Sequence, residues 1–175
     1  MDQKYLKEIY HQIVNVDNFP IKGINFKDIT PLFLKPELVN KIIDELVVFA
    51  IDMKADVILA PESRGFLFGL PTALKANLPF VLARKPEKLP RETVSEPCVL
   101  EYAKTAFHVH QDAILPNQRV LIIDDLLATG GTTNCLAKLI KKLGGILIGS
   151  AFCVEIKALN GRANASTPVF AVVSY

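Results

Sequence analysis

One stretch of the chain, residues 120–133, has a strong structural signal: Val120-Leu121-Ile122-Ile123-Asp124-Asp125-Leu126-Leu127-Ala128-Thr129-Gly130-Gly131-Thr132-Thr133. Its four leading aliphatic residues predict a strand that is buried on both faces, as in a parallel sheet. Two adjacent carboxylates follow at the carboxyl end of that strand, where open α/β sheets bind ligands. Small residues come next and lead into a helix predicted over about 132–143. Because small residues let the backbone approach an anion, this pattern predicts a phosphate-binding loop beside two acids.

Two common nucleotide-binding motifs are absent from this stretch. It contains neither G-x-x-x-x-G-K-[ST] nor G-x-G-x-x-G, which disfavours a nucleoside triphosphatase or a dinucleotide enzyme. A sugar phosphate suits the pattern better, since the loop would hold the phosphate while the carboxylates take up sugar hydroxyls or a magnesium ion bound to them. The simpler interpretation is a turn at a strand end with two solvated acids.

The rest of the chain alternates strands and helices around this stretch. Apolar runs predict strands at 57–60, 80–83 and 146–154. Helices are predicted over about 6–13, from Pro36 onward, and after Gly65 to about Ala76, whereas residues 17–31 are expected to form an ordered loop. This alternation predicts an α/β fold with a mostly parallel central sheet flanked by helices, in one domain over residues 1–175.

The connection between the second and third predicted strands is unusually long. Residues 85–97 contain Pro86, Pro90 and Pro97 with interleaved charges, a poor composition for a core. Long connections of this kind in compact domains are usually lids or binding loops. Residues 99–109 could pair after it as a β-hairpin or arm.

Composition narrows the possible functions. The chain has 175 residues, half of them hydrophobic, and 20 Lys+Arg against 18 Asp+Glu give 20 − 18 = +2. Such a balance gives no support to electrostatic binding of nucleic acid or of a membrane surface through the overall charge of the protein. No apolar run reaches the roughly 18–20 residues of a membrane helix, and charges near Met1 argue against a signal peptide, so we expect a cytoplasmic protein.

The cysteines and histidines show no metal-ligand spacing. Cys98, Cys135 and Cys153 form no C-x-x-C pair, and we predict three free thiols in a reducing compartment. The three histidines supply no H-E-x-x-H signature.

The strand, the paired acids and the small-residue loop resemble the signature of the type I phosphoribosyltransferases. Five further segments resemble the adenine-using members of that family, in the same order along the chain. They are Phe19-Pro20-x-x-Gly23-x-x-Phe26-x-Asp28-Ile29, Glu62-Ser63-Arg64-Gly65-Phe66-Leu67-Phe68-Gly69, Arg84-Lys85-x-x-Lys88-Leu89-Pro90, Leu100-Glu101-Tyr102-x-Lys104 and Val154-Glu155-x-x-x-Leu159-x-Gly161-Arg162. The resemblance implies the type I fold, with an N-terminal hood over about 1–34, a flexible active-site loop over about 85–102, and a homodimer.

The resemblance also implies a reaction, in which a purine ring nitrogen displaces pyrophosphate from an activated ribose. Such a transfer needs both reactants fixed and the leaving charge neutralised. The catalytic residues implied are Glu101, for proton transfer, and Arg64, for the leaving group. Contacts to phosphoribosyl pyrophosphate are implied for Glu62, Ser63, Arg64, Lys88, Asp124, Asp125, Ala128, Thr129, Gly130, Gly131 and Thr132.

Magnesium is the implied cofactor, held indirectly by Asp124 and Asp125 through substrate hydroxyls or water. Adenine is implied to bind between Phe26 and Leu126, with backbone groups near Asn25 and Lys27 at its edge. Three alternatives remain open. The base could be hypoxanthine, guanine, xanthine or orotate. The protein could be a regulator that senses phosphoribosyl pyrophosphate without catalysis, or a plain sugar-phosphate binder.

Overall fold

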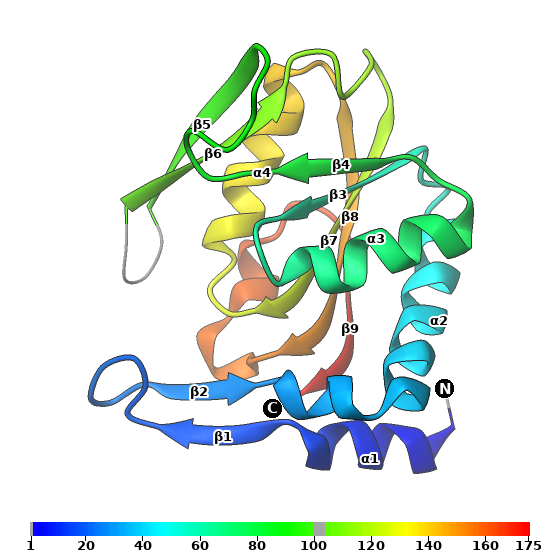
Figure 1. Ribbon diagram of the computed structural model, residues 1–175, viewed down its shortest axis with the longest axis vertical. Coiled ribbons are helices and arrows are strands. Elements are labelled where there is room, and N and C mark those ends of the chain that lie inside the picture. The colour runs from blue at the N-terminus through cyan, green and yellow to red at the C-terminus, as the bar shows by residue number, and fades with distance from the viewer. Residues whose placement is uncertain (1, 100–103) are drawn as a thin grey trace. The chain divides into compact units, whose positions relative to one another are not determined.

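The computed structural model describes residues 2–99 and 104–175 (Figure 1). Glu101, the implied proton-transfer residue, lies outside the described residues. The chain divides into two compact units, one ending at Glu45 and one running from Leu46 to Tyr175. Within the described residues no helix is long and apolar enough to cross a membrane.

The first unit contains a helix, a β-hairpin and a 3₁₀ turn before the long helix α2. Its elements are α1 Gln3–Gln12, β1 Val14–Asp17, β2 Asn25–Asp28, η1 Thr30–Leu34 and the start of α2 Pro36–Asp52. The Asp2 side chain caps α1 by accepting a hydrogen bond from the backbone N–H of Lys4. On the core side of this unit Ile9, Leu32 and Leu38 are fully buried.

The hairpin of the first unit corrects one prediction. Residues 17–31 were expected to form a loop without strands, whereas Asn25–Asp28 pairs antiparallel with Val14–Asp17. The turn between the strands is closed by the Asn18 side chain, which accepts a hydrogen bond from Gly23 N–H. Both turn residues have a positive φ, which asparagine and glycine tolerate best. The strands were missed because four-residue strands with one exposed face have no local period to detect.

The second unit is built on a five-stranded parallel sheet with strand order β4-β3-β7-β8-β9. The strands are β3 Val57–Pro61, β4 Phe80–Ala83, β7 Arg119–Leu127, β8 Ile146–Glu155 and β9 Val169–Ser174, and the helices are α3 Gly65–Ala76 and α4 Gly131–Lys142. Two 3₁₀ turns, η2 Lys157–Leu159 and η3 Gly161–Asn164, connect β8 to β9. The prediction of a parallel α/β fold is therefore confirmed, but strand β9 was not predicted.

The two helices cover opposite faces of this sheet (Figure 1). Helix α3 lies so close to β3 that a Cβ added at Gly69 would stand 2.7 Å from the Cβ of Ala60. On the other face, α4 contributes Leu136, Leu139 and Ile140 to a core with alternate residues of β3 and β7. This packing places the carboxyl ends of β3 and β7 beside the amino ends of both helices.

The arm predicted after the long connection is present and longer than expected. Strand β5 Thr93–Val99 pairs antiparallel with β6 Lys104–His110, and β6 joins the sheet edge through two backbone hydrogen bonds between Arg84 and His108. The prediction that residues 93–97 are part of a loop is wrong. A charged residue such as Glu96 is typical of a loop, but here Glu96 is buried against α4. Its burial is possible because Lys142 lies 2.6 Å from its carboxylate.

The arm and α4 are also joined by a disulfide. The sulfurs of Cys98 on β5 and Cys135 on α4 are bonded, with their Cα atoms 5.6 Å apart. Cys153 is a free, buried thiol. The prediction of three free thiols is therefore wrong for two of them, because residues 37 apart in sequence share no motif and meet only when the arm packs on α4.

Candidate active site

A cleft of about 380 Å³ opens at the carboxyl edge of the parallel sheet in the second unit. It is lined by the end of β3, the end of β7, the loop into α4 and two residues of the arm. The lining residues are Pro61, Glu62, Ser63, Arg64, Lys85, Thr105, Phe107, Asp124, Asp125, Leu126, Leu127, Ala128, Thr129, Gly130, Gly131, Thr132 and Thr133. The fold thus brings together most of the residues that the sequence implied for phosphoribosyl pyrophosphate.

The loop after β7 ends at the amino terminus of α4. Gly130 precedes the helix with a φ of 87°, a conformation that favours glycine, and Asn134 N–H makes the first helical hydrogen bond to its carbonyl. The N–H groups of Gly131, Thr132 and Thr133 precede that bond, so they have no carbonyl of their own helix to pair with. Because these residues line the cleft, the helix start can bind an anion there.

The paired acids lie inside β7, which extends to Leu127 rather than ending at Ile123 as expected. Asp125 is 5% exposed and its carboxylate lies 3.0 Å from the guanidinium of Arg64. Asp124 accepts a hydrogen bond from the N–H of Asp125 at 2.8 Å. Burial, and next the neighbouring Asp125 carboxylate, raise the pKa of Asp124 well above its ordinary value. Two acids crowded at the cleft fit a site for a cation.

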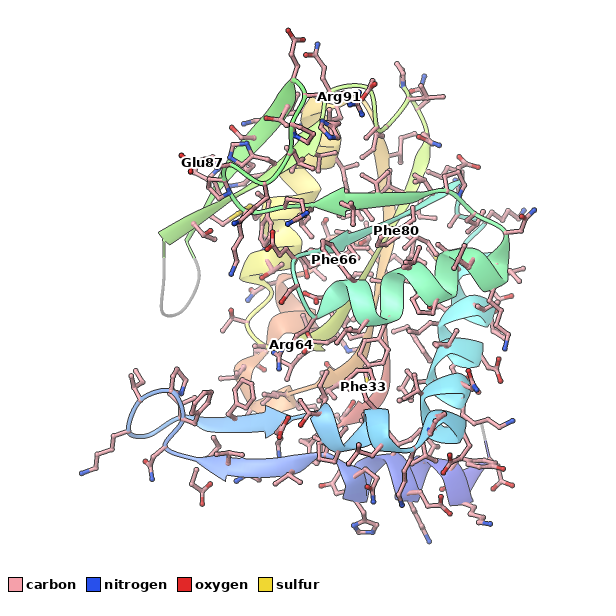
Figure 2. All side chains as sticks on the ribbon, in the orientation of Figure 1. Phe33, Arg64, Phe66, Phe80, Glu87 and Arg91 are labelled. Carbon is pink, nitrogen blue, oxygen red and sulfur yellow. A yellow bond between two sulfur atoms is a disulfide. The ribbon has the colours of Figure 1, made fainter. Side chains whose placement is uncertain are left out.

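Arg64 lies at the start of α3, as Figure 2 shows. Its side chain is 37% exposed, so the guanidinium borders the cleft while it contacts Asp125. An Arg next to buried acids can pair with an anionic group of a ligand in the same cleft. The position suits the neutralising role that the resemblance implies.

Glu62 lines the cleft, but its carboxylate is used by the neighbouring strand end. It accepts hydrogen bonds from Arg84 Nε at 2.8 Å and from the N–H of Lys85 at 3.0 Å. These two donors, Arg84 first, lower the pKa of Glu62. The carboxylate therefore anchors the start of the connection that leads to the arm.

Several implied residues are not placed in the cleft. Lys88 is exposed and does not belong to the described lining. Asn25, Phe26 and Lys27 lie on β2 of the first unit, whereas Leu126 lines the cleft of the second. Lining residues that were not included among the site residues are Pro61, Lys85, Thr105, Phe107, Leu127 and Thr133. Only the pairing of β6 at the sheet edge brings Thr105 and Phe107 here, and no local sequence signal predicts it.

Comparisons with known proteins agree with this architecture. Residues 34–172 match the model of a family described as a phosphoribosyl transferase domain. An adenine phosphoribosyltransferase from Ureaplasma parvum serovar 3 is 47% identical over 167 residues, which cover 95% of this chain and 96% of that relative.

Two solved structures share nearly the whole length. An adenine phosphoribosyltransferase from Thermoanaerobacter pseudethanolicus has a TM-score of 0.92 and 44% identity, covering 97% of this chain and 99% of that one. One from Saccharomyces cerevisiae, complexed with an imino-altritol bisphosphate and adenine, has a TM-score of 0.91 and 35% identity, covering 98% and 99%.

The parallel sheet, the glycine-containing loop at the start of α4 and the matched family model together define the class. The chain belongs to the phosphoribosyltransferase family. In each of the three pairwise comparisons the relative is an adenine phosphoribosyltransferase, the branch of the family to which the sequence motifs also point.

Proposed function

We propose that this protein transfers the 5-phosphoribosyl group of phosphoribosyl pyrophosphate to adenine, giving AMP and pyrophosphate, a step of purine salvage. The observation that carries the proposal is the cleft, in which an anion-binding helix start, two acids and Arg64 share one space of about 380 Å³. A substrate with a phosphate at one end and a pyrophosphate at the other matches that distribution of charge.

Each part of the cleft receives one part of the substrate. The loop of Ala128, Thr129, Gly130, Gly131 and Thr132 binds the 5′-phosphate through the start of α4. Asp124 and Asp125 accept hydrogen bonds from the ribose hydroxyls. Arg64, with the backbone of Glu62 and Ser63, holds the pyrophosphate and offsets the negative charge that grows as it leaves. Lys88 completes that contact from the connection after β4.

Magnesium fits this site as a cofactor shared with the substrate. Within the described residues no group of three or more acids, histidines or cysteines could hold a metal alone. Magnesium commonly uses one or two carboxylates together with substrate phosphates, and Asp124 and Asp125 place two adjacent carboxylates at the cleft. When bound, the ion would neutralise pyrophosphate oxygens, while Asp124 and Asp125 hold it through hydroxyls or water.

The base would bind with Phe26 on one ring face and Leu126 on the other, and backbone groups near Asn25 and Lys27 would contact its edge. Glu101 would exchange a proton with the base. In this proposal residues 1–34 act as a hood, and the segment over residues 85–102, which includes β5, covers the site and excludes water. Exclusion of water strengthens the electrostatic interactions inside the site. The relative from Saccharomyces cerevisiae that was solved with adenine supports the choice of base.

A base-selectivity assay tests the reaction. The purified protein is incubated with phosphoribosyl pyrophosphate, magnesium and one of adenine, hypoxanthine or guanine, and the monophosphate is measured by chromatography. We expect AMP from adenine and loss of product when magnesium is chelated. If only hypoxanthine gave a product, hypoxanthine and not adenine would be the substrate. If no base gave a product, a role in sensing phosphoribosyl pyrophosphate would be favoured.

A second experiment tests the proton-transfer role. Glu101→Gln should lower kcat by about 100-fold or more, while the binding of phosphoribosyl pyrophosphate stays within about twofold. Glu37→Gln is the matched control, because Glu37 is an exposed glutamate on α2. Unchanged turnover in Glu101→Gln would remove this residue from the mechanism.

We further propose a homodimer that works in the cytoplasm. Leu67, Leu70 and Leu74 form an exposed apolar stripe along α3, with 45%, 43% and 71% of their surfaces accessible. A second copy that covers this stripe would remove it from water. Leu70→Glu/Leu74→Glu should then shift the dimer to monomer in sedimentation, and an unchanged dimer would place the interface elsewhere. Phosphoribosyl pyrophosphate carries several phosphate charges and does not cross membranes unaided. We therefore expect the enzyme to work in the compartment where this substrate is made, which we propose is the cytoplasm.

A further inference from the structure

We propose that Gly161 and Asn164 are positioning residues, which hold the phosphate loop in its binding shape from the side opposite to the cleft. The inference rests on the proposed role of this loop in binding the 5′-phosphate. Both residues belong to the 3₁₀ turn η3, and neither is among the described residues that line the cleft. They would act on the reaction only through the loop.

The approach of Gly161 to the loop is close enough to exclude a side chain. A Cβ added there would overlap the carbonyl oxygen of Ala128 and stand 2.9 Å from a methyl carbon of Leu127. In the other direction, a Cβ added at Gly130 would stand 3.1 Å from the carbonyl oxygen of Gly161. The two backbones are therefore in direct contact, so η3 blocks movement of the loop toward it.

Asn164 adds a directed hydrogen bond to this contact. Its side-chain Nδ2 donates to the carbonyl oxygen of Thr129 at 3.0 Å. In a trans peptide the C=O of one residue and the N–H of the next point in opposite directions. With the carbonyls of Ala128 and Thr129 turned toward η3, the N–H groups of Thr129 and Gly130 are turned the other way. This is the orientation in which they can point at a phosphate.

The turn η3 is itself fixed to the ends of two strands. Arg162 donates two hydrogen bonds to the Glu155 carboxylate at the end of β8, at 2.9 Å and 2.7 Å. Ser174 at the end of β9 donates to the same carboxylate at 3.1 Å. The N–H of Ile156 donates to the carbonyl of Leu127 just before the loop. The support behind the loop is thus tied to the sheet at both sides.

Comparing AMP with adenosine separates a positioning role from a general structural one, because the two ligands differ only in the phosphate. Asn164→Leu keeps the approximate size of the side chain and removes the donor. We expect its Kd for AMP, measured by calorimetry, to rise about 3- to 10-fold, the effect of one hydrogen bond. Its Kd for adenosine should change less than twofold. In kinetics, KM for phosphoribosyl pyrophosphate should rise while KM for adenine stays constant.

Two further variants complete the test. Gly161→Ala should weaken AMP binding by more than Asn164→Leu does, because its new methyl group displaces the loop. Asn40→Leu, at an exposed position on α2, is the control for replacing an asparagine and should leave both affinities unchanged. If Gly161→Ala does not fold, Asn164→Leu still decides the question.

Thr132→Glu, inside the loop, places a negative charge where the phosphate is proposed to bind. Weaker AMP binding in both Thr132→Glu and Asn164→Leu would support the inference. A loss in Thr132→Glu with unchanged binding in Asn164→Leu, or an equal loss for AMP and adenosine in Asn164→Leu, would overturn it and leave the phosphate loop in place. Unchanged AMP binding in Thr132→Glu would overturn both proposals.

Discussion

Replacing Arg162 with methionine should destabilise the protein by leaving a buried carboxylate without its main partner. Glu155 has a side chain that is 6% exposed, and Arg162 donates to both of its oxygens. Methionine keeps the apolar part of the arginine side chain, so the substitution removes charge and hydrogen bonds more than packing. After the change, Ser174 is the remaining side-chain donor that the structure places at Glu155.

The size of the effect follows from the burial of the two partners. Breaking a fully buried ion pair by removing one partner costs about 3–5 kcal/mol. Arg162 is 49% exposed, so water can reach the site and screen the charge. We therefore expect a loss of about 1.5–3 kcal/mol at pH 7.5. For a chain of this length, that corresponds to a fall in Tm of roughly 4–10 °C.

The pH dependence of this loss has a defined sign. The hydrogen bonds from Arg162 are the main cause that lowers the pKa of Glu155 in the folded protein. Stability from such a group is present above the unfolded pKa, about 4.3 for glutamate, and is lost as the pH falls through the folded pKa. The difference between wild type and Arg162→Met should be constant between about pH 6 and 8, and should shrink as the pH falls below about 4.

Urea unfolding at a series of pH values measures this difference. The matched control is Arg91→Met, since the ion pair of Arg91 with Asp112 is 60% and 66% exposed at its two ends and should contribute little. The double variant Glu155→Gln/Arg162→Met should be more stable than Arg162→Met alone, because it removes the orphaned charge. A cost for Arg162→Met no larger than that of Arg91→Met, or one that does not vary with pH, would refute the argument from a buried charge.

Two other predictions concern the acids and the cysteines. Asp124→Asn should stabilise the ligand-free protein at pH 7.5 by about 0.5–2 kcal/mol. The pKa of Asp124 is raised on folding, so its carboxyl group favours the folded state at low pH and loses that contribution as the pH rises through the folded pKa. The same variant should lose about 10- to 100-fold in activity with magnesium, and a lower stability at pH 7.5 would contradict the cause given for the raised pKa. Thiol titration of the unfolded, unreduced protein should find one reactive cysteine, Cys153, rather than three, and three would show that the Cys98–Cys135 bond does not form. Where the bond forms, its reduction should cost about 3–4 kcal/mol for a loop of 37 residues.

The elements that could be predicted from the sequence are those whose signal is local. The strands β3, β4 and β8 and the helices α3 and α4 have continuous apolar runs or clear end signals, and their predicted bounds agree with the structure within a few residues. The acids and the phosphate loop directly follow the apolar run of residues 120–123, so their place at the sheet edge could be inferred without knowing the fold. Asp124 and Asp125 themselves lie inside a longer strand than expected, because β7 continues to pair with β8 as far as Leu127.

The elements that were missed depend on partners far away in the sequence. The hairpin of the first unit and strand β5 are held by cross-strand pairing and, at Glu96, by a lysine on α4 that neutralises a buried charge. Local polarity predicts a loop for such segments, since a carboxylate without its partner would stay in water. Strand β9 had an apolar run, Val169-Phe170-Ala171-Val172-Val173, that could have identified it.

The segment of Gly161 and Arg162 shows why a motif can be visible while its role is not. Both residues stand in the run from Val154 to Arg162 that resembles the family, yet nothing in that run indicates a ligand. Their contacts explain the residue types. A glycine is required because its backbone meets the carbonyl of Ala128, and an arginine because a carboxylate buried at a strand end needs a bidentate partner. Under the proposed function, the loop beside the cleft can then consist of small residues, which approach a phosphate closely but supply little rigidity of their own. The rigidity comes instead from a turn that begins about thirty residues later in the chain and lies outside the cleft.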